Sequence, residues 1–186
     1  MTDFASVDSD SRSEKTALEL LHELLFGLLL VTDGRTTELL ETLLNEKLVV
    51  TVLRQERWDK ETYIRESVLT GEKSGYIASH NVALVSSKHL PAPLFEKIAD
   101  RQEGIGKTIG SNALRSFRKV VEAGRIDAAD AVDLFRRPLR LQLPELRSQV
   151  PYKKYLIYFD REPGIQMLEY YNPDLVRHRL RRETGG

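Results

Sequence analysis

Two charged residues within predicted strands are the first candidates for chemistry. Arg65 lies in the stretch YIRESVLTG, and Glu169 lies in GIQMLEYY. A guanidinium can bind a carboxylate through two parallel hydrogen bonds, and a positioned carboxyl group can transfer a proton. From the residues alone, Arg65 is either an edge residue or half of a cross-strand ion pair, or it binds a ligand. Glu169 suggests a pocket.

Alternation along the strands assigns neighbours to both residues, because successive side chains point to opposite faces of a sheet. Arg65 is predicted to share a face with Leu69, while Glu66 points the other way and is therefore not its ion-pair partner. Glu169 is predicted to share a face with Met167 and Tyr171. A carboxylate on such a face is costly to bury without a partner.

Other motifs give weaker evidence of a functional site. GIGKTIG, residues 104–110, lacks the residue spacing of a phosphate-binding loop and does not follow a strand, so we do not predict nucleotide binding. Its backbone N–H groups could still attract a carboxylate at the start of a helix. His80 is predicted to share a face with Ala78 and Val82, where a histidine is more often a core residue than a catalyst. The histidines show no ligand spacing, so we expect no metal.

Composition narrows the class of protein. The 186 residues suit one domain, and the 28 Lys and Arg balance the 28 Asp and Glu. We therefore expect no nucleic-acid or membrane partner. The absence of cysteine excludes thiol chemistry and is compatible with a reducing cytosol. The start of the chain is polar rather than a secretory signal, and the longest apolar run, residues 24–31, is too short to span a bilayer. We expect a cytoplasmic protein.

The first half of the sequence predicts helices followed by strands. Residues 1–13 are rich in Ser and Asp and are predicted to be a disordered tail. A helix capped by Ser13 should run to about Val31, and a second, short helix capped by Thr36 or Thr37 should follow. A strand starts at Lys47, and an antiparallel hairpin with a glycine turn follows it.

The second half predicts more helices and a closing hairpin. A short helix begins at the prolines near residue 91, and a glycine-containing loop leads into a helix that ends at Gly124. Asp127–Phe135 is read as another short helix, LRLQL as a strand, and the residues around the REPG turn as two strands. The basic residues 176–186 are predicted to fray as a tail.

This order of elements favours an α+β fold. Tight turns, and not crossover helices, join the successive strands, which predicts a single antiparallel β-sheet with helices packed on one side.

Several blocks, taken in order, resemble the chorismate pyruvate-lyase family, whose fold is shared with the ligand-sensing domains of some bacterial transcription regulators. The blocks are DGRTTELLETL, YIRESVLTG with GYIASHNVAL, LPAPLFEKI with EGIGKTI, and YKKYLIYFDREPGIQMLEYYNP. The resemblance covers about residues 20–173 and implies a domain of residues 14–175. In the family, the loop after the helix that LPAPLFEKI resembles usually contains Pro-Leu-Gly. This sequence lacks that tripeptide there.

The resemblance implies a cofactor-independent carbon–oxygen lyase that removes pyruvate from chorismate and leaves 4-hydroxybenzoate. Arg65 aligns with the arginine that binds the ring carboxylate, and Glu169 with the glutamate that faces the ring hydroxyl. The backbone N–H groups that also bind the carboxylate fall at about Thr36 and Ile105. Arg65 and Glu169 are then the catalytic residues, and all four bind substrate.

This sequence departs from the family at Thr36, next to Ile105, and at His80. Thr36 stands where a larger apolar residue is usual, and a glycine precedes Ile105 where proline is common. His80 replaces an arginine found in some members, so Arg35 or Lys107, or else Lys154, could bind the second carboxylate.

Two alternatives remain open at this point. The chain is either a family member that acts on another small cyclic acid in specialised metabolism, or a non-catalytic domain that senses small acids. Only about 45 residues precede the first strand, so we expect no helix-turn-helix there. A monomer and a homodimer are both compatible with the sequence.

Overall fold

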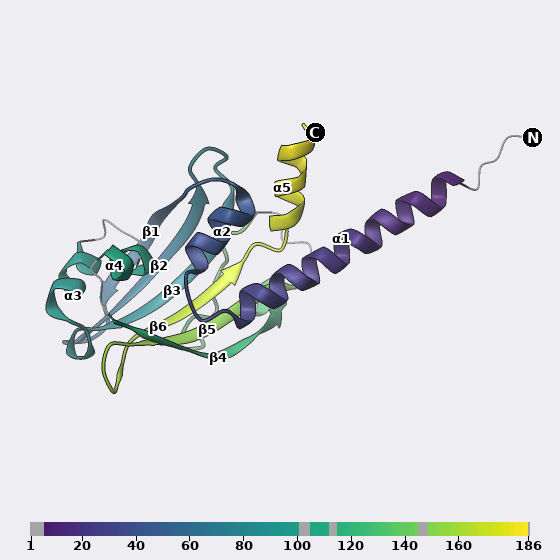
Figure 1. Cartoon of the computed structure of the whole chain (residues 1–186). Coiled ribbons are helices and arrows are strands. Elements are labelled where there is room, and N and C mark those ends of the chain that lie inside the picture. Colours follow the sequence, from purple (N-terminus) through teal and green to yellow (C-terminus); the bar gives the residue numbers. More distant parts are fainter. Residues whose placement is uncertain (1–5, 101–104, 112–114, 145–148, 186) are drawn as a thin grey trace, which may run out of the picture.

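Six strands form one sheet in the order β1-β2-β3-β6-β5-β4, and every neighbouring pair is antiparallel (Figure 1). The fold comes from a computed structural model, which describes residues 6–100, 105–111, 115–144 and 149–185. The strands are β1 (Leu48–Arg57), β2 (Thr62–Gly71), β3 (Ile77–Ser86), β4 (Phe117–Ile126), β5 (Val150–Tyr158) and β6 (Pro163–Tyr171).

In the described part of the chain, five α-helices accompany the sheet. They are α1 (Ser6–Val31), α2 (Thr36–Leu44), α3 (Ala92–Ala99), α4 (Ile105–Ser111) and α5 (Leu175–Thr184). Two short 3-10 helices, η1 (Ser87–His89) and η2 (Ala128–Asp130), lie in the connections. No helix of the described residues has the length and apolar content needed to cross a membrane.

The α-helices pack on one face of the sheet, which we call the helix face. Over one half of it, Leu94 and Ile98 of α3 and Ile105 and Ile109 of α4 pack against a cluster that includes Met167. Over the other half, α1, α2 and α5 contribute a second cluster, which includes Phe26, Leu40, Leu175 and Tyr171. The predicted α+β architecture is confirmed.

The opposite face is covered by residues 127–144, which follow β4 and which we call the covering segment. Its side chains Ala131, Leu141 and Leu143 form a third cluster with Ile64 and Leu168 from the sheet. Because both faces are covered, the central strands β3 and β6 are buried along most of their length.

Three predicted elements were wrong. Residues 117–126 form the edge strand β4 and not the end of a helix, because they pair with β5 along its length. The covering segment contains only η2 where a helix was expected, and LRLQL makes no strand, although Leu141 and Leu143 are buried. These residues are held by packing and by long-range hydrogen bonds that a local pattern does not show.

The two ends of the chain also differ from the expected tails. Helix α1 begins at Ser6, within the stretch expected to be disordered, and extends beyond the sheet (Figure 1). Near the other end, α5 buries Leu175 and Val176. Arg182 of α5 forms an ion pair with Glu46, which also accepts hydrogen bonds from Ser74, so α5 is fixed to the domain.

Candidate ligand-binding site

A band of buried polar side chains crosses the helix face between its two hydrophobic clusters. We call it the polar band. Its members are less than a tenth exposed: Arg65 1%, Ser79 0%, Asn81 6%, Lys153 2% and Glu169 5%. Burying so many polar groups together is costly unless they have partners, so the band is the first candidate for a binding site.

Strand register brings these residues together. Asn81 of β3 lies opposite Glu169 of β6, and Lys153 of β5 lies on the other side of Glu169. Arg65 of β2 lies opposite Ala83, the residue of β3 that follows Asn81 on the same face. Strand spacing and rise therefore separate the Cα atoms of Arg65 and Glu169 by about 12 Å, a distance that suits one small ring between the two side chains.

Two tyrosine hydroxyls hold Glu169. Tyr155 donates to Oε1 at 2.9 Å, and Tyr171 donates to Oε2 at 2.5 Å. Burial, reinforced by the adjacent Glu169 carboxylate, raises the pKa of both tyrosines well above its usual value, so both remain protonated donors. Both oxygens of Glu169 therefore act as hydrogen-bond acceptors within the protein.

Arg65 reaches the end of a helix. Its Nη1 donates to the carbonyl oxygen of Ile98, in the last turn of α3, at 3.2 Å. A cation is favourable there because the last carbonyl groups of a helix carry partial negative charge. Gln55 donates to the next carbonyl, that of Ala99, at 2.9 Å. These bonds fix α3 over the band.

Lys153 plays a similar part at α1. Its ammonium group donates to the carbonyl oxygens of Leu29 and Thr32, both at 3.0 Å, and lies 3.4 Å from the Thr36 hydroxyl. Burial lowers the pKa of Lys153, and nearby Glu169 partly offsets this by attraction. An ammonium has three donors. Lys153 thus fixes the end of α1 and the start of α2.

Two buried polar atoms of β3 complete the polar band. Ser79 Oγ and Asn81 Oδ1 are buried and make no hydrogen bond to any described residue. They lie opposite Tyr171 and Glu169 on β6, so both point to the helix face. An unsatisfied buried polar group costs about 1–3 kcal/mol. A bound ligand would supply the missing partners.

A cavity of about 670 Å³ opens beside the band, between the α1–α2 turn and the start of β4. Thr32, whose carbonyl accepts from Lys153, lines it, so the cavity and the band meet there. Arg118 also lines it, with a buried Nε that makes no hydrogen bond to any described residue. The positive charge of Arg118 acts to lower the pKa of both Lys153 and Tyr155, because it lies near them.

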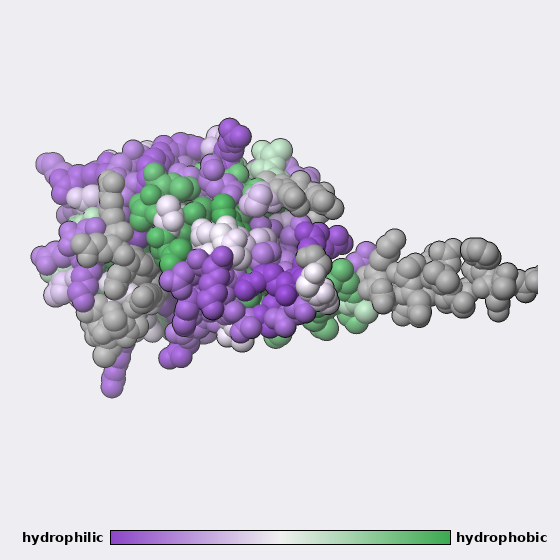
Figure 2. Space-filling model, turned by 90° about the horizontal axis from the view of Figure 1, so that it is seen from above, coloured by the Kyte–Doolittle hydropathy of each residue, from purple (hydrophilic) through white to green (hydrophobic). Residues whose placement is uncertain are grey.

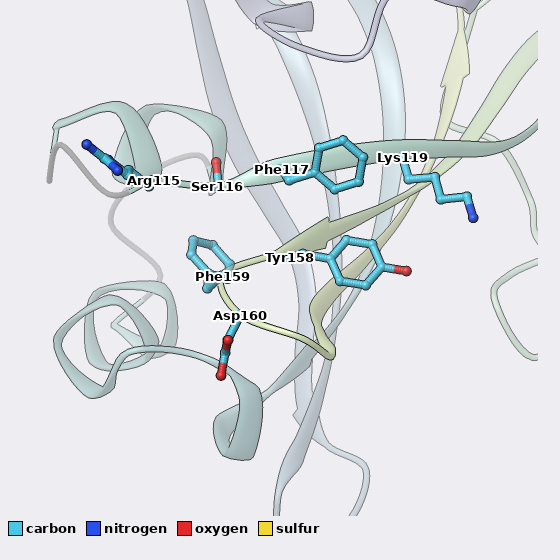
Figure 3. Close-up of a pocket in the computed structure, with 7 residues that line it drawn as sticks. All are labelled: Arg115, Ser116, Phe117, Lys119, Tyr158, Phe159 and Asp160. Carbon is cyan, nitrogen blue, oxygen red and sulfur yellow. The ribbon is translucent and has the colours of Figure 1, made fainter.

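A second cavity, of about 480 Å³, lies at the start of β4 and the end of β5 (Figure 3). Phe117, Lys119 and Tyr158 line it, and it holds none of the residues that the sequence predicted for the site. Among the described residues, no group of three or more His, Asp or Glu side chains could hold a metal ion.

Thr36 and Ile105 both lie at helix starts and are buried. Thr36 is the first residue of α2, and its hydroxyl is near Lys153. It is not the helix cap that the sequence predicted, because Arg35 occupies that position without a side-chain cap bond. Ile105 begins α4 and packs in the cluster with Leu94.

The remaining predicted residues are not members of the band. Arg35 is exposed, forms an ion pair with Glu38 and lines the cavity of about 670 Å³ beside the band. His80 points to the opposite face, where it contacts Glu66 at 3.0 Å. A bulge near Leu69 moves Ala78 to the helix face, so Ala78 does not share the face of His80 as predicted. The Lys107 side chain lies outside the described part.

Sequence reasoning missed Lys153, Ser79 and Asn81 and named Lys154 instead. Lys154 lies opposite Leu168, on the other face of β5. Alternation alone does not choose between two adjacent lysines. The register could have done so, because pairing of Ile157 with Ile165 across the REPG turn places Lys153 opposite Glu169.

Comparisons with known proteins show likeness in structure only. No family model and no curated protein matches the sequence. PhnF from Mycobacterium smegmatis is similar over 77% of this chain and 66% of its own, with 15% identity and a TM-score of 0.49. YydK from Bacillus subtilis, described as a possible transcriptional regulator, is similar over 72% of this chain and 60% of its own, with 12% identity and a TM-score of 0.44.

A third similar structure is a ligand-binding domain assigned to a GntR-family transcriptional regulator from Bordetella bronchiseptica. It matches 67% of this chain and 85% of its own, with 10% identity and a TM-score of 0.40. This chain thus spans less than two thirds of the length of PhnF and YydK. At these identities the likeness is one of fold alone.

Proposed function

We propose that this chain binds a small carboxylic acid in the polar band and acts as a ligand-binding domain. One observation carries the proposal: Ser79 Oγ and Asn81 Oδ1 are buried without a partner among the described residues. Both atoms belong to β3, which lies between β2 with the buried Arg65 guanidinium and β6 with the buried Glu169 carboxylate. A ligand with polar groups would satisfy both atoms, and the binding energy would then include the relief of their unsatisfied state.

The cationic end of the band favours an acid. Arg65 presents a planar group that can bind a carboxylate through two hydrogen bonds. The bond to Ile98 holds the guanidinium of Arg65 against the last turn of α3, so little side-chain freedom is lost on binding. The Cα atoms of Arg65 and Glu169 are separated by about 12 Å, and this distance suits an aromatic or cyclic acid of about one ring.

The arrangement at Glu169 favours binding over turnover. A general acid must give up a proton to the ligand, whereas Glu169 accepts two hydrogen bonds from Tyr155 and Tyr171. A ligand hydroxyl that approached Glu169 would compete with a tyrosine. The tyrosines therefore support a role for Glu169 in fixing the shape and polarity of the site.

A binding experiment tests this proposal with simple probes. Isothermal titration calorimetry would compare benzoate and 4-hydroxybenzoate with benzamide, which has the same shape and no charge. We expect the acids to bind at least about tenfold more tightly than the amide, since an ionic hydrogen bond contributes more than a neutral one. Equal affinity for acid and amide, or no binding of any small acid, would contradict the proposal.

Chorismate lyase activity is the second candidate function. The observation in its favour is that Arg65 and Glu169 share one buried face, as the resemblance implies for the substrate-binding arginine and glutamate. Incubation with chorismate, followed by detection of pyruvate and 4-hydroxybenzoate, tests it. Product formation that is lost in Arg65→Met would make the site catalytic. Binding of 4-hydroxybenzoate without any turnover of chorismate would leave the ligand-binding function alone.

A further inference from the structure

Helix α1 carries a stripe of exposed aliphatic side chains. Leu21, Leu24, Leu28 and Val31 are 45%, 59%, 68% and 75% exposed, and Leu20 beside them is 54% exposed. The steps of three, four and three residues are those of the a and d positions of a heptad repeat. Exposed leucines in this spacing are typical of a surface that packs against another helix.

The other side of α1 already has its partner. Phe26 and Leu29 are buried against α2, α5 and the sheet, at positions f and b of the same heptad. The N-terminal half of the helix extends beyond the sheet (Figure 1), and hydrophobic residues lie on one side of the point where α1 leaves the domain, next to hydrophilic ones (Figure 2). The stripe therefore remains exposed when the domain is fully folded.

We propose that this stripe joins two copies of the chain, with α1 of one copy packed against α1 of the other. A 3.5-residue repeat suits a second helix with the same repeat, and a second copy supplies one. The glutamates Glu19 and Glu23 fall at positions f and c, outside the seam, so two copies do not bring these like charges into contact.

The area of the stripe is sufficient for such a dimer. The exposed parts of its five residues amount to about 500 Å² per copy, or about 1,000 Å² for two, which reaches the lower limit for a specific interface. A single-chain surface with this much contiguous apolar area is at the upper end for a monomer. A symmetric pair removes it from water on both copies at once.

Sedimentation equilibrium of the full chain tests the proposal. We expect twice the 21.3 kDa chain mass between about 1 and about 100 μM. The variant Leu24→Gln with Leu28→Gln should dissociate at least about 100-fold more readily, because it removes four apolar side chains from the interface. The matched control is Val49→Gln with Leu53→Gln, which changes two exposed aliphatic residues of β1, 43% and 44% exposed, and should remain dimeric.

Cross-linking gives an independent readout, because the chain contains no cysteine. Under mild oxidation, Leu24→Cys should form a disulfide-linked dimer, while Glu19→Cys, an exposed residue away from the seam, should not. A monomeric wild type, a seam variant that remains dimeric, or equal cross-linking of the two cysteine variants would overturn the proposal. The far-ultraviolet circular dichroism of each variant confirms that the domain remains folded.

Discussion

The two faces of the sheet bury polar groups in different ways. On the face under the covering segment, Gln142 N–H donates to His80 Nδ1, and His80 Nε2 donates to Glu66, both at 3.0 Å. The hydroxyl of Tyr170 bonds to both backbone groups of Val132. On the helix face, Ser79 and Asn81 each retain a buried atom without a partner in the described structure.

Under the proposed function, this difference separates polar groups that hold the fold together from polar groups that bind a ligand. The His80 network is closed: each atom in it has a partner within the protein, and burial lowers the pKa of the imidazole while Glu66 opposes this. Such a network fixes the covering segment in place. The helix face holds more charged side chains, but some of its buried polar atoms lack hydrogen-bond partners among the described residues. A network whose hydrogen bonds are all made has no need of a ligand.

The largest effect is expected at Arg65. Replacing it in Arg65→Met keeps the length of the side chain but removes the cation, so the affinity for benzoate should fall at least about 100-fold, which corresponds to about 3 kcal/mol. Calorimetry of the variant measures this. Arg54→Met is the matched control, because Arg54 pairs with Glu66 on the opposite face and its loss should leave affinity unchanged. Equal losses in the two variants would refute the assignment of the faces.

The next largest effect should fall on stability. His80→Leu leaves Glu66 and the Gln142 N–H without their shared partner, so the free energy of unfolding should drop by about 2–3 kcal/mol with no change in benzoate affinity. Urea unfolding can be followed by fluorescence of Trp58, which stacks on Phe135 of the covering segment at 4.2 Å. His89→Leu, at a half-buried histidine, should change stability by less than about 0.5 kcal/mol.

Ser79→Ala should have opposite effects on folding and binding. Removing an unsatisfied hydroxyl should leave the free protein as stable or up to about 1 kcal/mol more stable, while the affinity for benzoate falls by about threefold to tenfold. Ser87→Ala serves as the control, since the Ser87 hydroxyl donates to the Glu61 carbonyl and its loss should slightly destabilise the protein. Destabilisation by Ser79→Ala would show that its hydroxyl has a partner after all.

The smallest effect is a dependence of stability on pH. Burial alone would raise the pKa of Asp133, but hydrogen bonds from Arg137 and Phe135 outweigh it and lower the pKa below 3.8. A lowered folded pKa means that the stabilisation is present above pH 3.8 and is lost as the pH falls further. Asp133→Asn should therefore lose about 1 kcal/mol at pH 7 and show a shallower decline in acid. An unchanged acid profile in urea titrations would rule out this role.

Alternation was enough to predict which residues share a face with Arg65 and with Glu169. It depends only on the strand period, and β2 and β6 are regular where these residues lie. To predict that His80 and Arg65 point to opposite faces, one needs the register between β2 and β3, which pairs Val68 with His80. Neither strand's own pattern contains that register.

The edge strand and the covering segment were beyond local patterns. In β4, exposed and half-buried residues alternate and none is fully buried, so Phe117–Ile126 lacks the apolar face that identifies a strand. Its conformation comes from pairing with β5. The covering segment is held by single contacts over long sequence distances, such as Gln142 to His80, and these follow from the tertiary fold.

The most direct test of the central claim is a methyl NMR titration of the full chain with benzoate. We expect shifts in methyl groups beside the polar band, at Ile98, Ile109 and Met167, and none at Leu141 and Leu143 under the covering segment. The shifts should be absent in Arg65→Met. Shifts confined to the covering segment, or the same shifts in the variant, would contradict binding of an acid on the helix face.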